Sequence, residues 1–261
     1  MATQYDEKII ISGFHVERYE YLDKYVLKDY ERKPRKPKEK NKPQTSKRES
    51  SIQRTKQKIK RLVNSNTHLT TFLTLTYGQE VLTPDKSNPI FMKFILRMVY
   101  HNKDFQYIAV IEFQNKSKRV HYHLLCNYPL DNFKSEHYKK KFERWFANYY
   151  WKNGFIKFKP IYNIENLGSY MCKYLSKDMT DARLFGKKKY FNSKKLNQPQ
   201  ELISYRAYKF IQEHDIDQME PKFKMQFHHE YIGRVNYSTY KLNQLPFINP
   251  FLIKSKNRVK W

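Results

Sequence analysis

Two tyrosines and two lysines at helical spacing could do chemistry in this chain. They lie in the stretch NLGSYMCKYLSKDM, residues 166–179, and share one helix face at i, i+3, i+4 and i+7: Tyr170, Lys173, Tyr174 and Lys177. A phenol has a pKa of about 10, so it is a poor nucleophile at neutral pH unless a cation or a metal stabilises the phenolate. A lysine three residues after each tyrosine could supply that charge. On this stretch alone, ordinary surface tyrosines and lysines are the alternative interpretation.

A second set of residues, upstream, could hold a metal ion. Residues 107–114 and 119–126 have the pattern of two strands joined by a polar turn. If they form a hairpin, Glu112 lies directly across from His121, and His123 is on the same side of its strand. Two imidazoles and one carboxylate on one sheet face suit Mg²⁺ or Mn²⁺ with open positions for water and substrate oxygens. A His-x-His alone would be weak evidence, and the carboxylate in register strengthens it.

The charge of the chain indicates a polyanionic partner. The 261 residues carry a formal net charge of +26, with a sequence pI near 9.8, which favours nucleic acid over a membrane surface. We expect a basic, flexible N-terminal arm up to about Glu49, where prolines interrupt regular structure. A helical pattern starts at Ser51, and its cations are candidates for phosphate contacts: Arg54, Lys56, Lys58, Lys60 and Arg61.

Several classes of protein are disfavoured. No apolar run is long enough to span a membrane, and we see no secretory leader. There is no GxxxxGK[ST] phosphate loop, hence no recognisable helicase motor, and we expect no small-molecule cofactor. Cys126 and Cys172 are predicted to be small buried hydrophobes in a reducing cytosol. We expect His228-His229-Glu230 to be a solvated strand end and not a second metal site.

The elements that must position these residues are expected to alternate. The patterns predict a strand at 70–77, a helix opened by Asn88-Pro89, the two strands of the hairpin, a helix from Asp131-Asn132 to about Trp151, an edge strand at 155–162 and the tyrosine helix. This order predicts an α+β fold, with an antiparallel sheet covered on one face by helices. Aromatic residues of the second helix are expected in the core: Tyr138, Phe142, Trp145, Phe146 and Tyr149.

Three segments are expected along the chain. They are an N-terminal segment with the basic arm (1–50), the catalytic domain (51–200), and a C-terminal extension packed on that domain (201–261). Within the tail, residues 199–214 have a helical pattern, and residues 222–230 and 233–242 have the pattern of a hairpin.

Three motifs in this order resemble those of the HUH endonucleases, specifically rolling-circle replication initiators of plasmids and small single-stranded-DNA phages. FLTLTY is similar to their first motif, and VHYHLL to the metal-binding His-hydrophobic-His motif, with Tyr122 in place of the usual aliphatic residue. YMCKYLSK is similar to the catalytic motif in its two-tyrosine form. The resemblance covers about Ser51 to Met179 and implies a central antiparallel sheet of the ferredoxin or RRM type with helices packed on it.

The resemblance also implies a mechanism. A metal on Glu112, His121 and His123 would polarise the scissile phosphate. Tyr170 or Tyr174 would attack it, keep the 5′-phosphate as a phosphotyrosine and release a 3′-hydroxyl primer, with the lysines stabilising the charge. The implied partners are single-stranded origin DNA, expected as a hairpin, and a host helicase and DNA polymerase in a bacterial cytoplasm.

Two alternatives stay open from the sequence. One is a relaxase or single-strand transposase with the same chemistry. The other is a non-catalytic DNA-binding repressor on this fold, for which the histidines, the carboxylate and both tyrosines would be unnecessary.

Overall fold

The chain folds into two compact units, which are described separately. The computed structural model describes residues 3–23, 26–28, 44–114, 117–130, 133–161, 167–168, 170–172, 181–184 and 186–246. We call residues Thr45–Asn197 the central unit; the end unit combines Met1–Gln44 with Gln198–Trp261. Within the described ranges, each unit contains one five-stranded sheet, and the end unit has a further two-stranded ribbon. The fold is therefore α+β, as predicted.

An antiparallel sheet organises the central unit, in the order β8-β5-β7-β6-β9. Its strands are β5 (Thr71–Tyr77), β6 (Tyr107–Phe113), β7 (Val120–Cys126), β8 (Gly154–Pro160) and β9 (Tyr190–Asn192). β-branched and aromatic residues dominate these runs because both fit a pleated, buried surface. The predicted edge position of the strand ending at Pro160 is confirmed; a proline there removes no hydrogen bond from a central ladder.

The hairpin of β6 and β7 has the predicted register. Glu112 pairs with His121 and Val110 with His123, and the backbone N–H of Gln114 donates to the carbonyl of Arg119 at 2.9 Å where the turn begins. Side chains alternate between the faces of a strand. Both histidines therefore lie on one side of the sheet, which we call the histidine face, whereas Tyr122 points to the opposite side.

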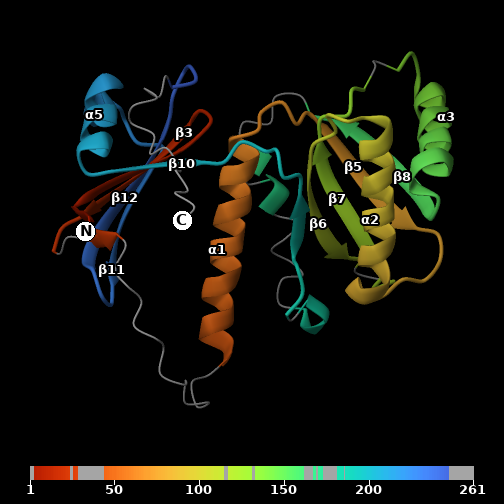
Figure 1. Cartoon of the computed structure of the whole chain (residues 1–261), viewed down its shortest axis with the longest axis horizontal. Coiled ribbons are helices and arrows are strands. Elements are labelled where there is room, and N and C mark those ends of the chain that lie inside the picture. Colours follow the sequence, from red (N-terminus) through yellow and green to blue (C-terminus); the bar gives the residue numbers. More distant parts are fainter. Residues whose placement is uncertain are drawn as a thin grey trace, which may run out of the picture. The chain divides into compact units, whose positions relative to one another are not determined.

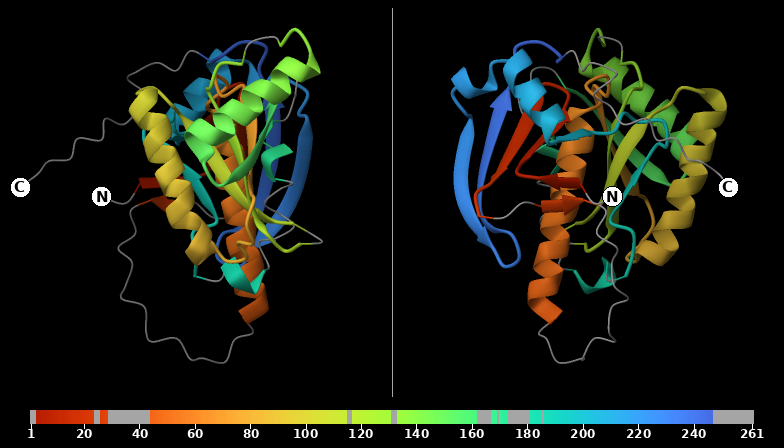
Figure 2. Two further views of the ribbon diagram at one scale, coloured as in Figure 1. Left: turned by 90° about the vertical axis from the view of Figure 1, so that its right-hand side faces the viewer. Right: turned by 60° about the vertical axis from the view of Figure 1, so that its left-hand side comes forward.

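Helix α2 (Pro84–His101) covers the side opposite the histidines, which we call the α2 face (Figures 1 and 2). Its inward side chains Phe91, Phe94 and Met98 are fully buried. The helix does not open at Asn88-Pro89 as predicted. It begins at Pro84, another proline suited to a first turn, and Pro89 lies inside the helix.

Helix α3 (Glu136–Phe146) also packs on the α2 face and continues into a π-helical turn, Ala147–Trp151. Its N-cap is Ser135, whose hydroxyl accepts from the backbone of Tyr138 at 3.5 Å; the predicted Asp131-Asn132 cap lies outside the described residues. Phe146 and Phe142 pack in the core as expected. The prediction was wrong for the remaining aromatic residues of this helix, which are about half exposed: Tyr138, Trp145 and Tyr149.

Helix α1 (Gln44–Asn64) covers the histidine face, so helices lie on both faces of the sheet and not on one (Figure 1). Its predicted apolar positions are buried: Ile52, Ile59, Leu62 and Val63. The helix starts seven residues before Ser51, so residues 44–49 are helical and not part of a flexible arm. The preceding part of the predicted arm lies outside the described residues. A short 3₁₀ turn, Ala182–Leu184, precedes β9.

The end unit is built from both ends of the chain. Its sheet has the order β10-β2-β3-β12-β11, with strands β2 (Glu7–Ser12), β3 (His15–Tyr21), β10 (Gln200–Ile203), β11 (Phe223–His229) and β12 (Gly233–Lys241). The ribbon pairs β1 (Thr3–Tyr5) with β4 (Val26–Lys28). Helix α5 (Tyr205–Glu213) and a 3₁₀ turn, Ile216–Gln218, pack on the sheet.

The end unit differs in part from the sequence prediction. The predicted hairpin of the tail is confirmed by β11 and β12. The predicted helix at 199–214 is instead a strand followed by the shorter helix α5. The predicted division at residues 50 and 200 did not include the pairing of β2 with β10 and of β3 with β12. No helix in the described ranges is both long and apolar enough to span a membrane.

Candidate functional site

The candidate site is built on the histidine face of the central sheet. His121 and His123 are both buried, while Glu112 is half-buried. Although Glu112 pairs with His121 in register, its carboxylate contacts the Nε2 atom of His123 on the diagonal. The Nε2 atom of His121 is buried and has no hydrogen-bond partner. Burial and the neighbouring His123 lower the pKa of His121, which favours the neutral imidazole that metal binding requires.

Strand β5 holds His123 from the other side. The hydroxyl of Thr74, its register partner, is 3.1 Å from His123 Nδ1, and the ring of Phe72 stacks on the imidazole with centroids 5.5 Å apart. A hydrogen bond to one ring nitrogen fixes the orientation of the other. Thr74 therefore directs Nε2 of His123 towards Glu112, a role that the first motif did not reveal from sequence alone.

The three side chains have the donor chemistry for a divalent metal, but they are not arranged as a finished site. In the described ranges, no three His, Cys, Asp or Glu side chains are grouped as a metal site. The rings of His121 and His123 have centroids 6.5 Å apart, whereas two imidazoles on adjacent positions of one ion have centroids about 4.5–5 Å apart. The orphaned nitrogen of His121 fits an ion, provided that the rings turn inward and Glu112 exchanges its contact with His123.

Tyr170 lies beside this group. Residues 167–168 and 170–172 are helical, and the ring of Tyr170 meets Phe72 edge-on, with centroids 5.7 Å apart. One aromatic ring thus separates Tyr170 from His123. The other predicted catalytic residues, Lys173, Tyr174 and Lys177, lie outside the described residues.

The tyrosine segment is held close to α1. A Cβ atom at Gly168 would lie 2.7 Å from Oδ1 of Asn64 and 2.8 Å from the carbonyl oxygen of Lys60, so only glycine permits this approach. The thiol of Cys172 donates to the carbonyl of Lys56 at 3.3 Å, and burial raises its pKa. Helix α1 therefore positions the segment that carries Tyr170.

Strand β8 adds side chains that the sequence prediction missed. Lys159 pairs with Phe72 and Lys157 with Thr74, so both lysines are on the histidine face and both are exposed. The ammonium of Lys159 lies 5.7 Å from the ring centroid of Tyr170, within reach of a cation–π interaction. Phe155, next to Thr76 in register, is 70% exposed. The period-2 alternation of FIKFKP could have revealed these side chains.

The predicted phosphate-binding cations lie along α1. Arg54 and Lys58 are exposed on this helix, and the other three are half-buried: Lys56, Lys60 and Arg61. The positive charges are therefore carried by the helix that packs against the tyrosine segment.

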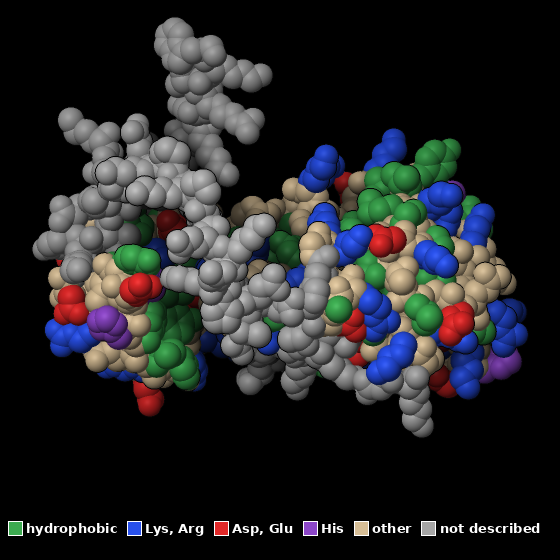
Figure 3. Space-filling model, turned by 90° about the horizontal axis from the view of Figure 1, so that it is seen from below, with side chains coloured by type: hydrophobic (Ala, Val, Ile, Leu, Met, Phe, Trp, Pro, Cys, Tyr) green, Lys and Arg blue, Asp and Glu red, His purple; other side chains and the backbone are tan. Residues whose placement is uncertain are grey.

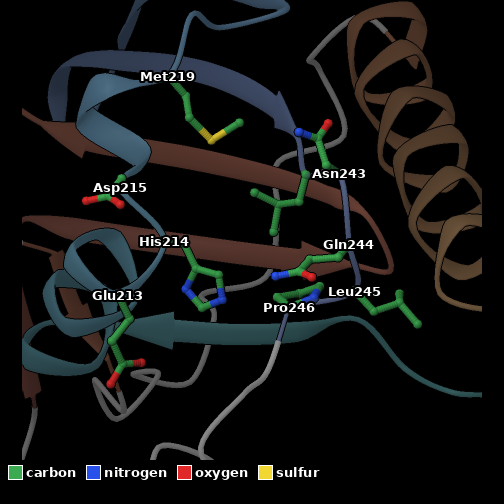
Figure 4. Close-up of a pocket in the computed structure, with 9 residues that line it drawn as sticks. Glu213, His214, Asp215, Met219, Asn243, Gln244, Leu245 and Pro246 are labelled. Carbon is green, nitrogen blue, oxygen red and sulfur yellow. The ribbon is translucent and has the colours of Figure 1, made fainter.

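The end unit has a hollow of about 830 Å³ between the end of α5 and residues 242–246 (Figure 4). His214 stacks on Phe210, with ring centroids 4.1 Å apart. None of the predicted site residues lines this hollow. His228-His229-Glu230, at the end of β11, is exposed as predicted.

Fold and site together describe an α+β protein with a histidine pair, a carboxylate and a tyrosine on one sheet face. Residues 70–179 match the family of replication-associated proteins of the ORF2 type. The match covers less than half of the chain and includes the histidine strand and the tyrosine segment. It supports a replication initiator of the Rep type. No curated protein and no solved structure matches the chain.

Proposed function

We propose that this protein initiates rolling-circle replication by nicking single-stranded origin DNA through a tyrosine. The observation that carries the proposal is the convergence of Glu112, His121 and His123 with Tyr170 on one sheet face, one aromatic ring apart. The family match supports the replication role. A binding module would need neither a buried, unpartnered imidazole nor a tyrosine beside it.

The site residues would divide the work as follows. Glu112, His121 and His123 would hold Mg²⁺ or Mn²⁺, which supplies Lewis-acid polarisation of the scissile phosphate. Lys157 and Lys159 would contact neighbouring phosphates, and Phe155 offers a ring on which a base can stack. The cations of α1 would add sequence-independent contacts.

The covalent step is a transesterification. The phenol oxygen of Tyr170 or Tyr174 forms a bond to phosphorus as the bond from phosphorus to the 3′-oxygen breaks. The phenol proton passes to solvent, and the 3′-oxygen leaves as a hydroxyl. The 5′-phosphate stays on the tyrosine, and attack by a 3′-hydroxyl in the reverse sense rejoins strands. Lys159 stabilises negative charge at Tyr170, and we propose the same role for Lys173 and Lys177.

The setting of this reaction is part of the proposal. The substrate would be an origin hairpin in a bacterial cytoplasm, on a plasmid or a phage genome. A host helicase would open the duplex, and a host polymerase would extend the 3′-hydroxyl.

The test is a covalent-adduct assay. The full chain is incubated with single-stranded oligonucleotides that tile its own replicon, with Mn²⁺ or with EDTA. We expect a slower-migrating protein–DNA band that needs metal. Tyr170→Phe and Tyr174→Phe should each weaken the band, Tyr174→Phe at least as strongly, and the double variant should abolish it.

Controls separate this outcome from the alternatives. Tyr149→Phe, which changes a half-exposed tyrosine on the other side of the sheet, should leave the adduct unchanged. Tight binding without an adduct on any oligonucleotide would replace the proposal with a non-catalytic DNA-binding protein. An adduct formed only with transfer-origin or transposon-end sequences would identify a relaxase or a transposase.

A further inference from the structure

A second candidate site lies in the central unit, at the edge of the sheet opposite β8. A cleft of about 440 Å³ opens between α2, the strand β9 and the start of β6. This volume lies within the range of about 300–1,000 Å³ that is usual for small-ligand sites. Phe191 of β9 lines the cleft and pairs with Ala109, so it faces α2. His123 pairs with Val110 and faces the other way, and the cleft is therefore separate from the histidine site.

The inner wall of the cleft is apolar and aromatic. Phe105, Tyr107 and Phe191 line it and are each less than a tenth exposed. Met92 and Val99 of α2 complete the wall and are each about 40% exposed. These two partly exposed apolar side chains are thus open to a ligand at this point.

The mouth of the cleft is strongly basic. Four lysines line it, against a single carboxylate, that of Asp104: Lys103, Lys188, Lys194 and Lys195. The ammonium of Lys188 lies 5.0 Å from the ring centroid of Phe191, so positive charge and an aromatic face occur together. Lysine and arginine side chains are interspersed with hydrophobic ones over the surface of this unit in the view from below (Figure 3).

We propose that this cleft binds a nucleotide, with its base against Phe191 and Val99 and its phosphate on Lys194 and Lys195. A flat apolar group joined to a negative charge is the ligand that such a wall and mouth complement. The net charge of +26 makes a phosphate-bearing partner the better match than an acidic peptide for the chain as a whole. The nucleotide is either free or one unit of a single strand. The inference does not rest on the nicking reaction.

The experiment compares two substitutions on one face of α2. Val99→Glu places a carboxylate in the cleft, whereas Leu96→Glu adds the same charge at a position that is 65% exposed and outside the cleft. The full chain is titrated in EDTA with two probes, dAMP carrying a methylanthraniloyl label and a fluorescein-labelled oligothymidylate. We expect Val99→Glu to weaken binding of at least one probe by about tenfold or more and Leu96→Glu to leave it close to wild type.

A second pair of variants separates local binding from general attraction. Lys194→Ala/Lys195→Ala removes two charges at the cleft, and Lys140→Ala/Lys141→Ala removes two exposed charges from α3. The first pair should weaken binding more than the second at equal salt. A loss with labelled dAMP indicates a free nucleotide, and a loss with oligothymidylate alone indicates a nucleotide within a strand. Equal effects of Val99→Glu and Leu96→Glu, or of the two lysine pairs, on both probes would overturn the proposal.

Discussion

Tyr122 provides the sharpest test of how the histidine strand is built. The residue stands between the two histidines but faces α2, where its ring stacks on Phe91 with centroids 4.2 Å apart and an interplanar angle of 9°. Its hydroxyl donates to Oδ1 of Asn88 at 2.7 Å and lies 2.8 Å from Oγ of Ser87. Burial raises the pKa of Tyr122, so the phenol stays protonated. This aromatic residue thus ties the strand to the first two turns of α2.

The cost of removing this hydroxyl can be estimated from its contacts. Tyr122→Phe loses two hydrogen bonds of about 0.5–1.5 kcal/mol each, and the fully buried Ser87 keeps only a 3.4 Å contact with the carbonyl of Pro84. We expect a loss of about 1–2 kcal/mol in unfolding free energy and about 3–6 °C in Tm. Tyr122→Leu, which restores an aliphatic residue, also loses the ring stack and leaves a cavity, for a total of about 2–4 kcal/mol.

The assay is urea unfolding of the full chain, followed through the emission of Trp151, which is fully buried in the central unit. Mn²⁺ titration of the same variants gives the second readout. Because Tyr122 faces away from the histidines, the Mn²⁺ affinity should stay close to wild type. Tyr122→Phe as stable as wild type, or with Mn²⁺ affinity at least about tenfold weaker while still folded, would refute this reasoning.

Three further predictions follow from the contacts around the site and in the end unit. Thr74→Val should weaken Mn²⁺ binding by about 10–100-fold, because it frees His123, whereas Thr74→Ser should restore it; calorimetric titration would show whether the hydroxyl is dispensable. Gly168→Ala should cost about 1–3 kcal/mol in thermal unfolding and reduce the DNA adduct, because the methyl group meets the backbone of α1; Ser135→Ala, in a cap remote from this contact, should keep the adduct. Burial raises the pKa of Glu7 to about 7, against the opposing hydrogen bond from its arginine partner, so the end unit should lose at most about 3 kcal/mol between about pH 4.5 and 7 as the carboxyl ionises. Glu7→Gln should flatten that part of a pH-stability profile, and an unchanged profile would show that the carboxyl is already ionised at low pH.

The hairpin was predictable because its information is local. A short polar turn between two alternating strands sets the register, and the register sets which residues face Glu112. Helix boundaries were less predictable. Pro84 and Pro89 both suit a first turn, and only the packing of α2 on the sheet decides between them.

Other features depend on contacts between distant parts of the chain. Trp145 and Tyr149 have the same apolar pattern as Phe146, and the sequence alone did not show which of them the sheet would cover. Lys159 comes beside Tyr170 only through the pairing of β8 with β5. The pairing of β2 with β10 joins residues nearly two hundred positions apart, and no local pattern specifies such a partner.

The end unit has a consequence for the order of events during synthesis. Its strands β2 and β3 leave the ribosome first, but their neighbours β10 and β12 are made only after the entire central unit. The first hairpin must therefore wait with both edges unpaired, since an isolated two-stranded hairpin is only marginally stable. The central unit has all its sheet partners in one continuous stretch and can fold while the rest is still being made. A chain that stops early would thus carry the histidine face without a completed end sheet.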